Sequence, residues 1–119
     1  MEVLRKPQWL KSEKLGAKKA QEILKTLRKY NLHTVCESAK CPNQGECFEN
    51  GTATFMILGE TCTRNCTFCA VDKTQNNLYP ADINEPVAIA KLAKELDLKY
   101  VVVTTVTRDD LPDGGASQF

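Results

Sequence analysis

The chain has 119 residues, of which 42% are hydrophobic and 26% are charged, a composition typical of one globular domain or less. Its 16 basic and 15 acidic side chains nearly cancel, so charge gives no reason to expect a nucleic-acid or membrane partner. Apolar runs such as 55–58 and 100–103 are too short to span a bilayer. The first residues lack the apolar stretch of a signal peptide, and Glu2 and Pro7 argue against a transit peptide. We therefore expect a cytoplasmic protein.

The first half of the chain is predicted to contain one regular helix. Residues 1–16 are basic and irregular, an arm that Trp9 is expected to anchor. Over residues 17–30 the apolar side chains recur at the spacing of one helical face, which predicts an amphipathic helix. Residues 31–51 show no periodicity and contain Pro42, Gly45 and Gly51. This stretch is predicted to be a loop that needs a ligand to order it.

The second half is predicted to form a βαβ unit. Residues 52–58 form an apolar run and 100–106 a β-branched run, and both are expected to be buried strands. After a polar loop over 76–82, a helix is predicted over 84–97, with Asn84 as its cap and Pro86 in its first turn. Strand, helix and strand in this order predict parallel pairing, with a ligand site at the carboxyl ends of the strands. The loops beginning at Cys62 and Arg108 both start there.

Six cysteines fall in two triplets and nowhere else. They are Cys36, Cys41 and Cys47, spaced C-x4-C-x5-C, and Cys62, Cys66 and Cys69, spaced C-x3-C-x2-C. A disulfide framework would fit a secreted, more cysteine-dense chain, whereas soft thiolates in a reducing compartment select zinc, Cu(I) or iron–sulfur clusters. Zinc sites usually have two C-x2-C-like pairs, which neither triplet resembles. Three thiolates in C-x3-C-x2-C spacing can hold three corners of a four-iron cluster and leave its fourth iron open.

The second triplet, with Phe68 before its last cysteine, resembles the hallmark motif of the radical S-adenosylmethionine (SAM) superfamily. Within that superfamily, the chain resembles the lipoyl synthase family over nearly its whole length. The segments that carry this resemblance are Lys6-Pro7-x-Trp9-Leu10, Thr34-Val35-Cys36-Glu37-x-Ala39-x-Cys41-Pro42-Asn43-x-x-Glu46-Cys47, 51–59 running into Cys62-Thr63-Arg64-x-Cys66-x-Phe68-Cys69, and Arg108-Asp109-Asp110-Leu111-x-Asp113-Gly114-Gly115-Ala116.

The resemblance implies two [4Fe-4S] clusters. Cys62, Cys66 and Cys69 would hold the radical-generating cluster, whose open iron binds SAM. Phe68 would lie against the SAM adenine, while Asp109 and Asp110 would either contact SAM or cap a turn. The other triplet, Cys36, Cys41 and Cys47, would hold an auxiliary cluster that is broken down to donate sulfur.

The resemblance also implies a fold and domain organisation. Residues 48–119 would begin the core domain, an α/β fold that is the N-terminal part of a partial (β/α) barrel. Residues 1–47 would be an N-terminal extension, with a helix and the auxiliary-cluster loop. The family's serine ligand, in an Arg-Ser-Ser-Tyr segment, does not occur in these residues. We therefore expect a fragment that is inactive alone.

The function implied is that of an enzyme, a radical SAM sulfurtransferase in the last step of lipoate biosynthesis. A 5′-deoxyadenosyl radical would abstract hydrogen from C6 and C8 of an octanoyl chain, and two sulfurs would be inserted. The partners would be octanoylated lipoyl carrier domains of 2-oxoacid dehydrogenases or the glycine cleavage H protein, and a low-potential electron donor such as ferredoxin or flavodoxin. Two alternatives remain open: a metal-binding module, holding iron–sulfur or zinc, without catalysis, and a radical SAM enzyme for another substrate.

Overall fold

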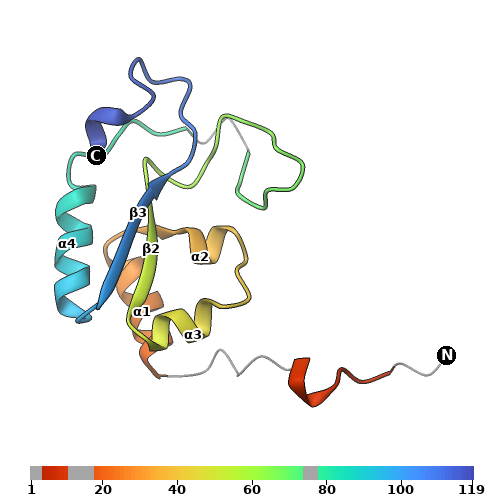
Figure 1. Ribbon diagram of the computed structural model, residues 1–119. Helices are drawn as coiled ribbons and strands as arrows, with labels where there is room; N and C mark the ends of the chain where they lie inside the picture. Colours follow the sequence, from red (N-terminus) through yellow and green to blue (C-terminus); the bar gives the residue numbers. More distant parts are fainter. Residues whose placement is uncertain (1–3, 11–17, 74–77) are drawn as a thin grey trace.

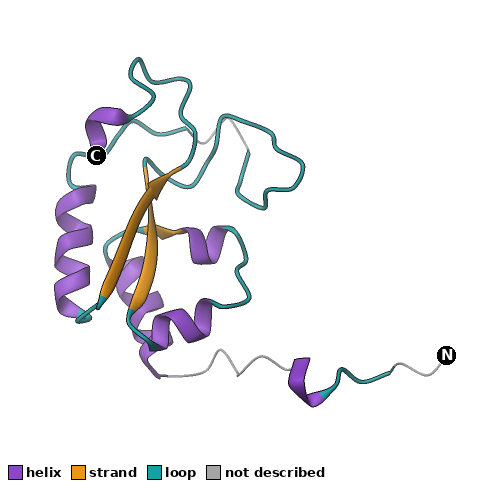
Figure 2. Ribbon diagram, in the orientation of Figure 1, coloured by secondary structure: helices purple, strands orange, loops and turns teal. Residues whose placement is uncertain are grey.

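The computed structural model describes residues 4–10, 18–73 and 78–119. Within these residues the chain is a mixed α/β structure with one three-stranded sheet, shown in Figures 1 and 2. The elements, in chain order and with η for a 3-10 helix, are η1 (Gln8–Leu10), α1 (Lys18–Lys29), β1 (His33–Thr34), α2 (Val35–Ser38), α3 (Gln44–Glu49), β2 (Thr52–Ile57), α4 (Glu85–Glu95), β3 (Tyr100–Thr105) and η3 (Ala116–Gln118).

The predicted parallel βαβ unit is confirmed. β2 and β3 pair in parallel, with a register that runs from Thr52 opposite Tyr100 to Ile57 opposite Thr105, and α4 connects them. The two strands therefore end at the same edge of the sheet, and the loops that follow them lie together at the top of Figure 1. The short strand β1 pairs antiparallel with the other side of β2, so β2 is the central strand.

β2 also supplies the centre of the hydrophobic core. Its alternate residues Ala53, Phe55 and Ile57 are buried, because successive side chains of a strand point to opposite faces. Three helices contribute further buried side chains to the same cluster: Ala20, Ile23 and Leu27 from α1, Phe48 from α3, and Ile89 and Leu92 from α4. Both helix predictions are confirmed, although Val87 of α4, which contributed to that prediction, is 54% exposed.

The prediction that residues 31–51 lack regular structure was wrong. Thr34 is the N-cap of α2, where its side-chain oxygen accepts a hydrogen bond from the Glu37 N–H, and Phe48 anchors α3 in the core. Helices of four and six residues are too short to produce the 3.6-residue periodicity on which the prediction relied. Their positions are set by a cap and by one buried aromatic side chain instead.

Two predictions of burial were also wrong. β3, which is an edge strand of the described sheet, is exposed over Tyr100–Val103. A β-branched run predicts a strand, but it does not show that another element covers that strand. Trp9 in η1 is 81% exposed and does not anchor the N-terminal arm; residues 4–10, the described part of that arm, lie away from the body in Figure 1.

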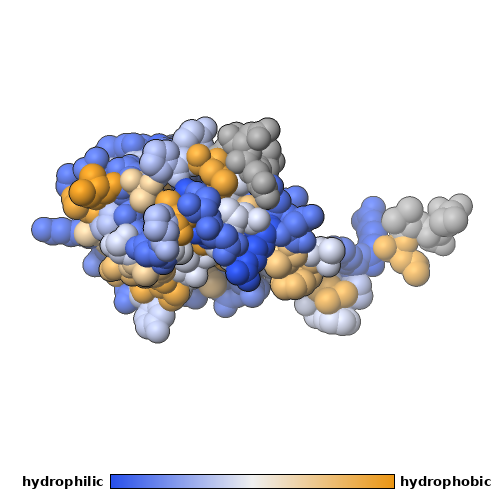
Figure 3. All heavy atoms as spheres, turned by 90° about the horizontal axis from the view of Figure 1, so that it is seen from above, coloured by the Kyte–Doolittle hydropathy of each residue, from blue (hydrophilic) through white to orange (hydrophobic). Residues whose placement is uncertain are grey.

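Asn84 lies at the N-cap of α4 as predicted, although its side chain makes no capping bond, and Pro86 is in the first turn. The loop predicted over 76–82 falls partly outside the described residues. None of the helices described is long and apolar enough to cross a membrane. Figure 3 looks down on the end of the molecule that carries the carboxyl ends of the strands, where hydrophilic and hydrophobic residues are mixed.

Candidate iron–sulfur centres

The second triplet lies in a loop whose two ends are paired with each other, next to the carboxyl end of β2. We refer to residues 62–71 as the Cys62 loop. Thr61 and Asp72 form an isolated parallel bridge, and the Cys62 N–H donates to the Asp72 carbonyl oxygen at 2.9 Å. The bridge therefore closes the base of the loop, and all three thiols lie beyond it. Cys66 is exposed, whereas Cys62 and Cys69 are partly covered.

The environment of Cys62 favours its thiolate. Partial burial disfavours the charged form, but hydrogen bonds from the Arg64 backbone, and from the backbone and side chain of Thr107, outweigh it and lower the pKa of the Cys62 thiol. Because metals bind the thiolate, a lowered pKa assists ligation. Thr107 follows β3, so the neighbouring strand's loop contributes directly to the first cysteine.

Thr63 and Arg64 join the Cys62 loop to the loop after β3. The Thr63 N–H donates to the Thr107 carbonyl oxygen at 3.0 Å, and its hydroxyl oxygen lies 3.0 Å from Asp109 Oδ2. Arg64 makes a two-pronged contact with the Asp109 carboxylate, at 3.1 and 3.3 Å. The bonds from Arg64 and then Thr63 lower the pKa of Asp109. The expectation that the two loops share one edge is therefore confirmed.

Both aspartates expected near SAM are paired with arginines of this chain. Asp110 accepts from Arg108 Nε and Nη2 at 2.9 and 2.8 Å, which lowers the pKa of Asp110. Asp109 is held by Arg64. In this arrangement both carboxylates hold loops in place, and contact with SAM stays a prediction. Phe68 is 91% exposed, and its contact with the adenine stays a prediction too.

The first triplet lies in what we call the Cys36 segment, residues 35–49. Cys36 is in α2 and Cys47 in α3, and the Cys41 N–H between them donates to the Cys36 carbonyl oxygen at 3.0 Å. Burial raises the pKa of the Cys36 thiol, with smaller increases from Cys41 and Cys47. The Arg28–Glu37 ion pair, at 2.7 Å, ties the segment to α1.

The donor chemistry of both triplets fits an iron–sulfur cluster. Proteins bind such clusters through cysteine thiolates, and all six cysteines are free of disulfides. Across residues 4–10, 18–73 and 78–119, no three His, Cys, Asp or Glu side chains converge closely enough to hold one metal ion.

Two of the residues that build this site, Glu85 and Arg108, were not predicted as functional. Glu85 accepts from the Leu58 N–H at 2.8 Å, and Arg108 Nη1 donates to the Leu58 carbonyl oxygen at 2.9 Å. Arg108 begins a motif that the sequence analysis singled out, which was a usable signal. Nothing in the sequence marks Glu85, because a glutamate in the first turn of a helix is common and usually exposed.

Comparison with known families agrees with this site. A sequence model of the radical SAM superfamily matches residues 56–118, the part that contains the Cys62 loop and the loop after β3. The chain belongs to the radical SAM superfamily. Residues 1–41 match a second model, described as the N-terminal domain of lipoyl synthase of the radical SAM family.

Curated lipoyl synthases from several organisms are similar to the chain throughout its length. It is 51% identical to the lipoyl synthase of Methylobacillus flagellatus, with 100% of this chain and 36% of the relative aligned. For the lipoyl synthase of Pseudoalteromonas atlantica the identity is 55%, over 99% of this chain and 37% of the relative. For the apicoplast lipoyl synthase of Plasmodium falciparum it is 53%, over 97% and 28%. The chain thus spans between a quarter and two fifths of the length of these relatives.

Proposed function

We propose that this chain provides both cluster-binding segments of a lipoyl synthase, an enzyme that inserts sulfur at C6 and C8 of protein-bound octanoyl groups. One observation carries the proposal. Both cysteine segments are attached to the same strand, since the Cys36 segment leads into β2 and the Cys62 loop follows it. A single strand therefore sets the relative position of the radical-generating centre and the sulfur donor.

The residues have separate tasks in this proposal. Cys62, Cys66 and Cys69 would hold the cluster that binds SAM, and Cys36, Cys41 and Cys47 the auxiliary cluster. When bound, these groups supply the one-electron chemistry and the sulfur, while the protein positions them. Thr63, Arg64 and Asp109 tie the Cys62 loop to the loop after β3, which keeps the proposed SAM site at the edge of the sheet.

The partners follow from the same proposal. An octanoyl chain carried on the lysine of a lipoyl carrier domain must reach both clusters, so the carrier domain would dock near the carboxyl ends of β2 and β3. Carrier domains of 2-oxoacid dehydrogenases and the glycine cleavage H protein are the substrates proposed, and ferredoxin or flavodoxin the electron donor. The family's partial (β/α) barrel would complete the sheet that β2 and β3 begin.

The test is anaerobic reconstitution of a full-length version, in which this chain is continued to the length of its relatives. We expect about eight irons per chain, as two four-iron clusters require. The electron paramagnetic resonance spectrum of the reduced protein should change when SAM is added. One bound zinc, with no response to SAM, would contradict the proposal and favour a metal-binding module.

A further inference from the structure

The backbone at Leu58, just beyond the end of β2, has a conformation that leucine rarely adopts. Its φ is 67°, and that of Gly59 is 86°, so two successive residues lie in the left-handed region. Glycine adopts this region at no steric cost, whereas a residue with a Cβ does not. These two residues turn the chain from β2 towards the Cys62 loop. The conformation at Leu58 must therefore be stabilised from outside.

Two buried, charged side chains hold the backbone of Leu58. The Glu85 carboxylate accepts from its N–H at 2.8 Å, and the Arg108 guanidinium donates to its carbonyl oxygen at 2.9 Å. Glu85 is 8% exposed and Arg108 is 3% exposed. Acidic and basic side chains are seldom buried so completely unless they are paired. Arg108 is paired with the Asp110 carboxylate as well as with the Leu58 carbonyl oxygen, whereas Glu85 binds the backbone N–H of Leu58.

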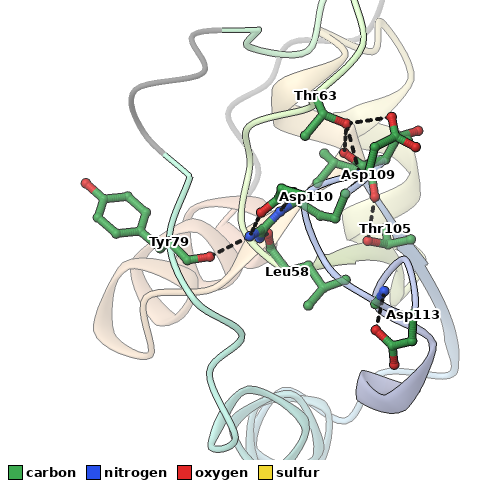
Figure 4. A network of polar contacts seen from close by, with 11 residues as sticks. Leu58, Thr63, Tyr79, Thr105, Asp109, Asp110 and Asp113 are labelled. Atoms are coloured by element: carbon green, nitrogen blue, oxygen red, sulfur yellow. Dashed lines mark hydrogen bonds and ion pairs between the residues drawn. The ribbon is translucent and has the colours of Figure 1, made fainter.

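Arg108 also binds one further segment and a carboxylate of its own loop. Its Nη2 donates to the Tyr79 carbonyl oxygen at 2.8 Å, and Nε and Nη2 bind Asp110. Figure 4 shows Leu58, Tyr79 and Asp110 around this centre. Arg108 thus joins the end of β2, the segment before α4 and the loop after β3. Bonds of this kind to a charged group are stronger than bonds between neutral groups.

We propose that Glu85 and Arg108 are positioning residues for the radical-generating centre. They act through Leu58: by fixing its backbone they set the direction in which the Cys62 loop leaves β2, and with it the place where the three thiols can meet. The inference rests on the proposed function, because it assigns these residues to the SAM-binding cluster. Neither side chain needs to touch the cluster or SAM.

The test compares three substitutions in α4. Glu85→Gln keeps an oxygen that can accept from the Leu58 N–H, whereas Glu85→Leu removes it at similar size. Glu95→Leu is the matched control, since Glu95 is at the other end of α4 and pairs only with Tyr30 and Lys29 among the bonds described. Arg108→Lys is added because a lysine keeps the charge but loses the fork that reaches three segments.

The first measurement is hydrogen exchange of the peptide spanning residues 57–62 in the cluster-free full-length version. Loss of the Leu58 bond in Glu85→Leu should speed its exchange about tenfold. Glu85→Gln should stay close to wild type, Arg108→Lys should be intermediate, and Glu95→Leu should match wild type. After reconstitution, the dissociation constant for SAM should rise in the same order, about tenfold for Glu85→Leu.

The outcomes separate this inference from the proposed function. If wild type shows no SAM response, the proposed function fails. If wild type responds to SAM but Glu85→Leu and Arg108→Lys match Glu95→Leu in exchange and affinity, the positioning role is wrong. Should Glu85→Leu fail to fold, the comparison of Arg108→Lys with Glu85→Gln decides. The inference requires faster exchange in Arg108→Lys and unchanged exchange in Glu85→Gln.

Discussion

The two cysteine segments are attached to the same strand, but they are held in different ways. Each has a phenylalanine beside its last cysteine: Phe48 follows Cys47, and Phe68 precedes Cys69. Phe48 is 0% exposed and packs in the core, whereas Phe68 is 91% exposed. The Cys36 segment is therefore anchored by apolar packing. The Cys62 loop is fixed at its base by polar contacts with Asp72, Thr107 and Asp109.

The two segments therefore differ in how far their stability depends on the hydrophobic core. Burial of a phenylalanine makes the Cys36 segment depend on the same core as α1, α4 and β2. The Cys62 loop keeps its middle free of core packing, which leaves Cys66 and Phe68 accessible to a ligand. Under the proposed function, a centre that binds and releases SAM at each turnover would suit the second arrangement.

The largest predicted effect distinguishes the two triplets by chemistry. In the full-length version, Cys66→Ala should abolish cleavage of SAM, because it removes one of the three thiolates of the proposed SAM-binding cluster. Cys41→Ala should leave cleavage intact and abolish sulfur insertion. Both products can be followed by mass spectrometry of one reaction, as 5′-deoxyadenosine and lipoylated carrier. Lipoylated product from Cys41→Ala would show that the sulfur-donor assignment is wrong.

The next prediction uses the matched phenylalanines. Phe48→Ala should lower the free energy of unfolding by about 3–5 kcal/mol, as for other buried aromatic side chains. Phe68→Ala should change it by less than about 0.5 kcal/mol, as for exposed sites, while weakening SAM binding if Phe68 lies against the adenine. Urea denaturation of the cluster-free full-length version measures the change in the free energy of unfolding for both variants. Equal losses would mean that the two segments are anchored alike.

A smaller effect concerns the contact between the end of β2 and the glycine pair after β3. Gly114 and Gly115 both have positive φ, 63° and 92°, but only at Gly115 would a Cβ meet another atom, Leu58 Cδ1 at 2.1 Å. Gly114→Ala should cost about 1–2 kcal/mol from its backbone conformation. Gly115→Ala should cost about 1–3 kcal/mol more, because Leu58 must move.

Thermal or urea unfolding of these two variants gives the difference directly. The Gly115→Ala variant should also lose more SAM affinity than Gly114→Ala, since its added methyl group displaces the residue from which the Cys62 loop departs. Identical unfolding curves and identical affinities for the two variants would show that Leu58 does not link the two loops.

The smallest effect is a pH dependence confined to the loop after β3. A hydrogen bond from the Ser117 side chain, followed by bonds from the N–H groups of Ser117 and Gly115 at 2.8 and 2.9 Å, lowers the pKa of Asp113 from 3.8 to about 2. A depressed carboxyl pKa stabilises the fold above pH 3.8, and the contribution is lost as the pH falls towards 2. The Asp113 carboxyl carbon, followed by NMR from pH 5 to 1.5, should titrate near 2. A midpoint near 3.8 would mean that these bonds are absent in solution.

The regular elements around this site could be predicted from the sequence because each depends on a local pattern. The apolar spacing of Ala20, Ile23 and Leu27 predicted α1, the runs at 52–58 and 100–106 predicted β2 and β3, and their order predicted parallel pairing. The shared edge of the two loops followed from that topology alone.

The rest could not be predicted because it depends on contacts between residues far apart in sequence. Nothing local indicates that Glu85 binds the N–H of Leu58, 27 residues away, or that Arg108 binds the carbonyl oxygen of the same residue, 50 residues away. The short helices α2 and α3 lack periodicity, and the exposure of β3 depends on which strands pair with it. Local patterns thus predicted the elements and their order. The bonds proposed to orient the Cys62 loop could be found only in the three-dimensional structure.

Under the proposed function, the two triplets hold two different clusters at either end of β2. The most direct test of this arrangement uses two triple variants of the full-length version. With Cys36, Cys41 and Cys47 all changed to alanine, the reconstituted protein should hold about four irons, and SAM should change its reduced spectrum. With Cys62, Cys66 and Cys69 changed instead, about four irons should remain, and SAM should have no effect. A SAM response that survives in the second variant and disappears in the first would contradict the assignment of both triplets.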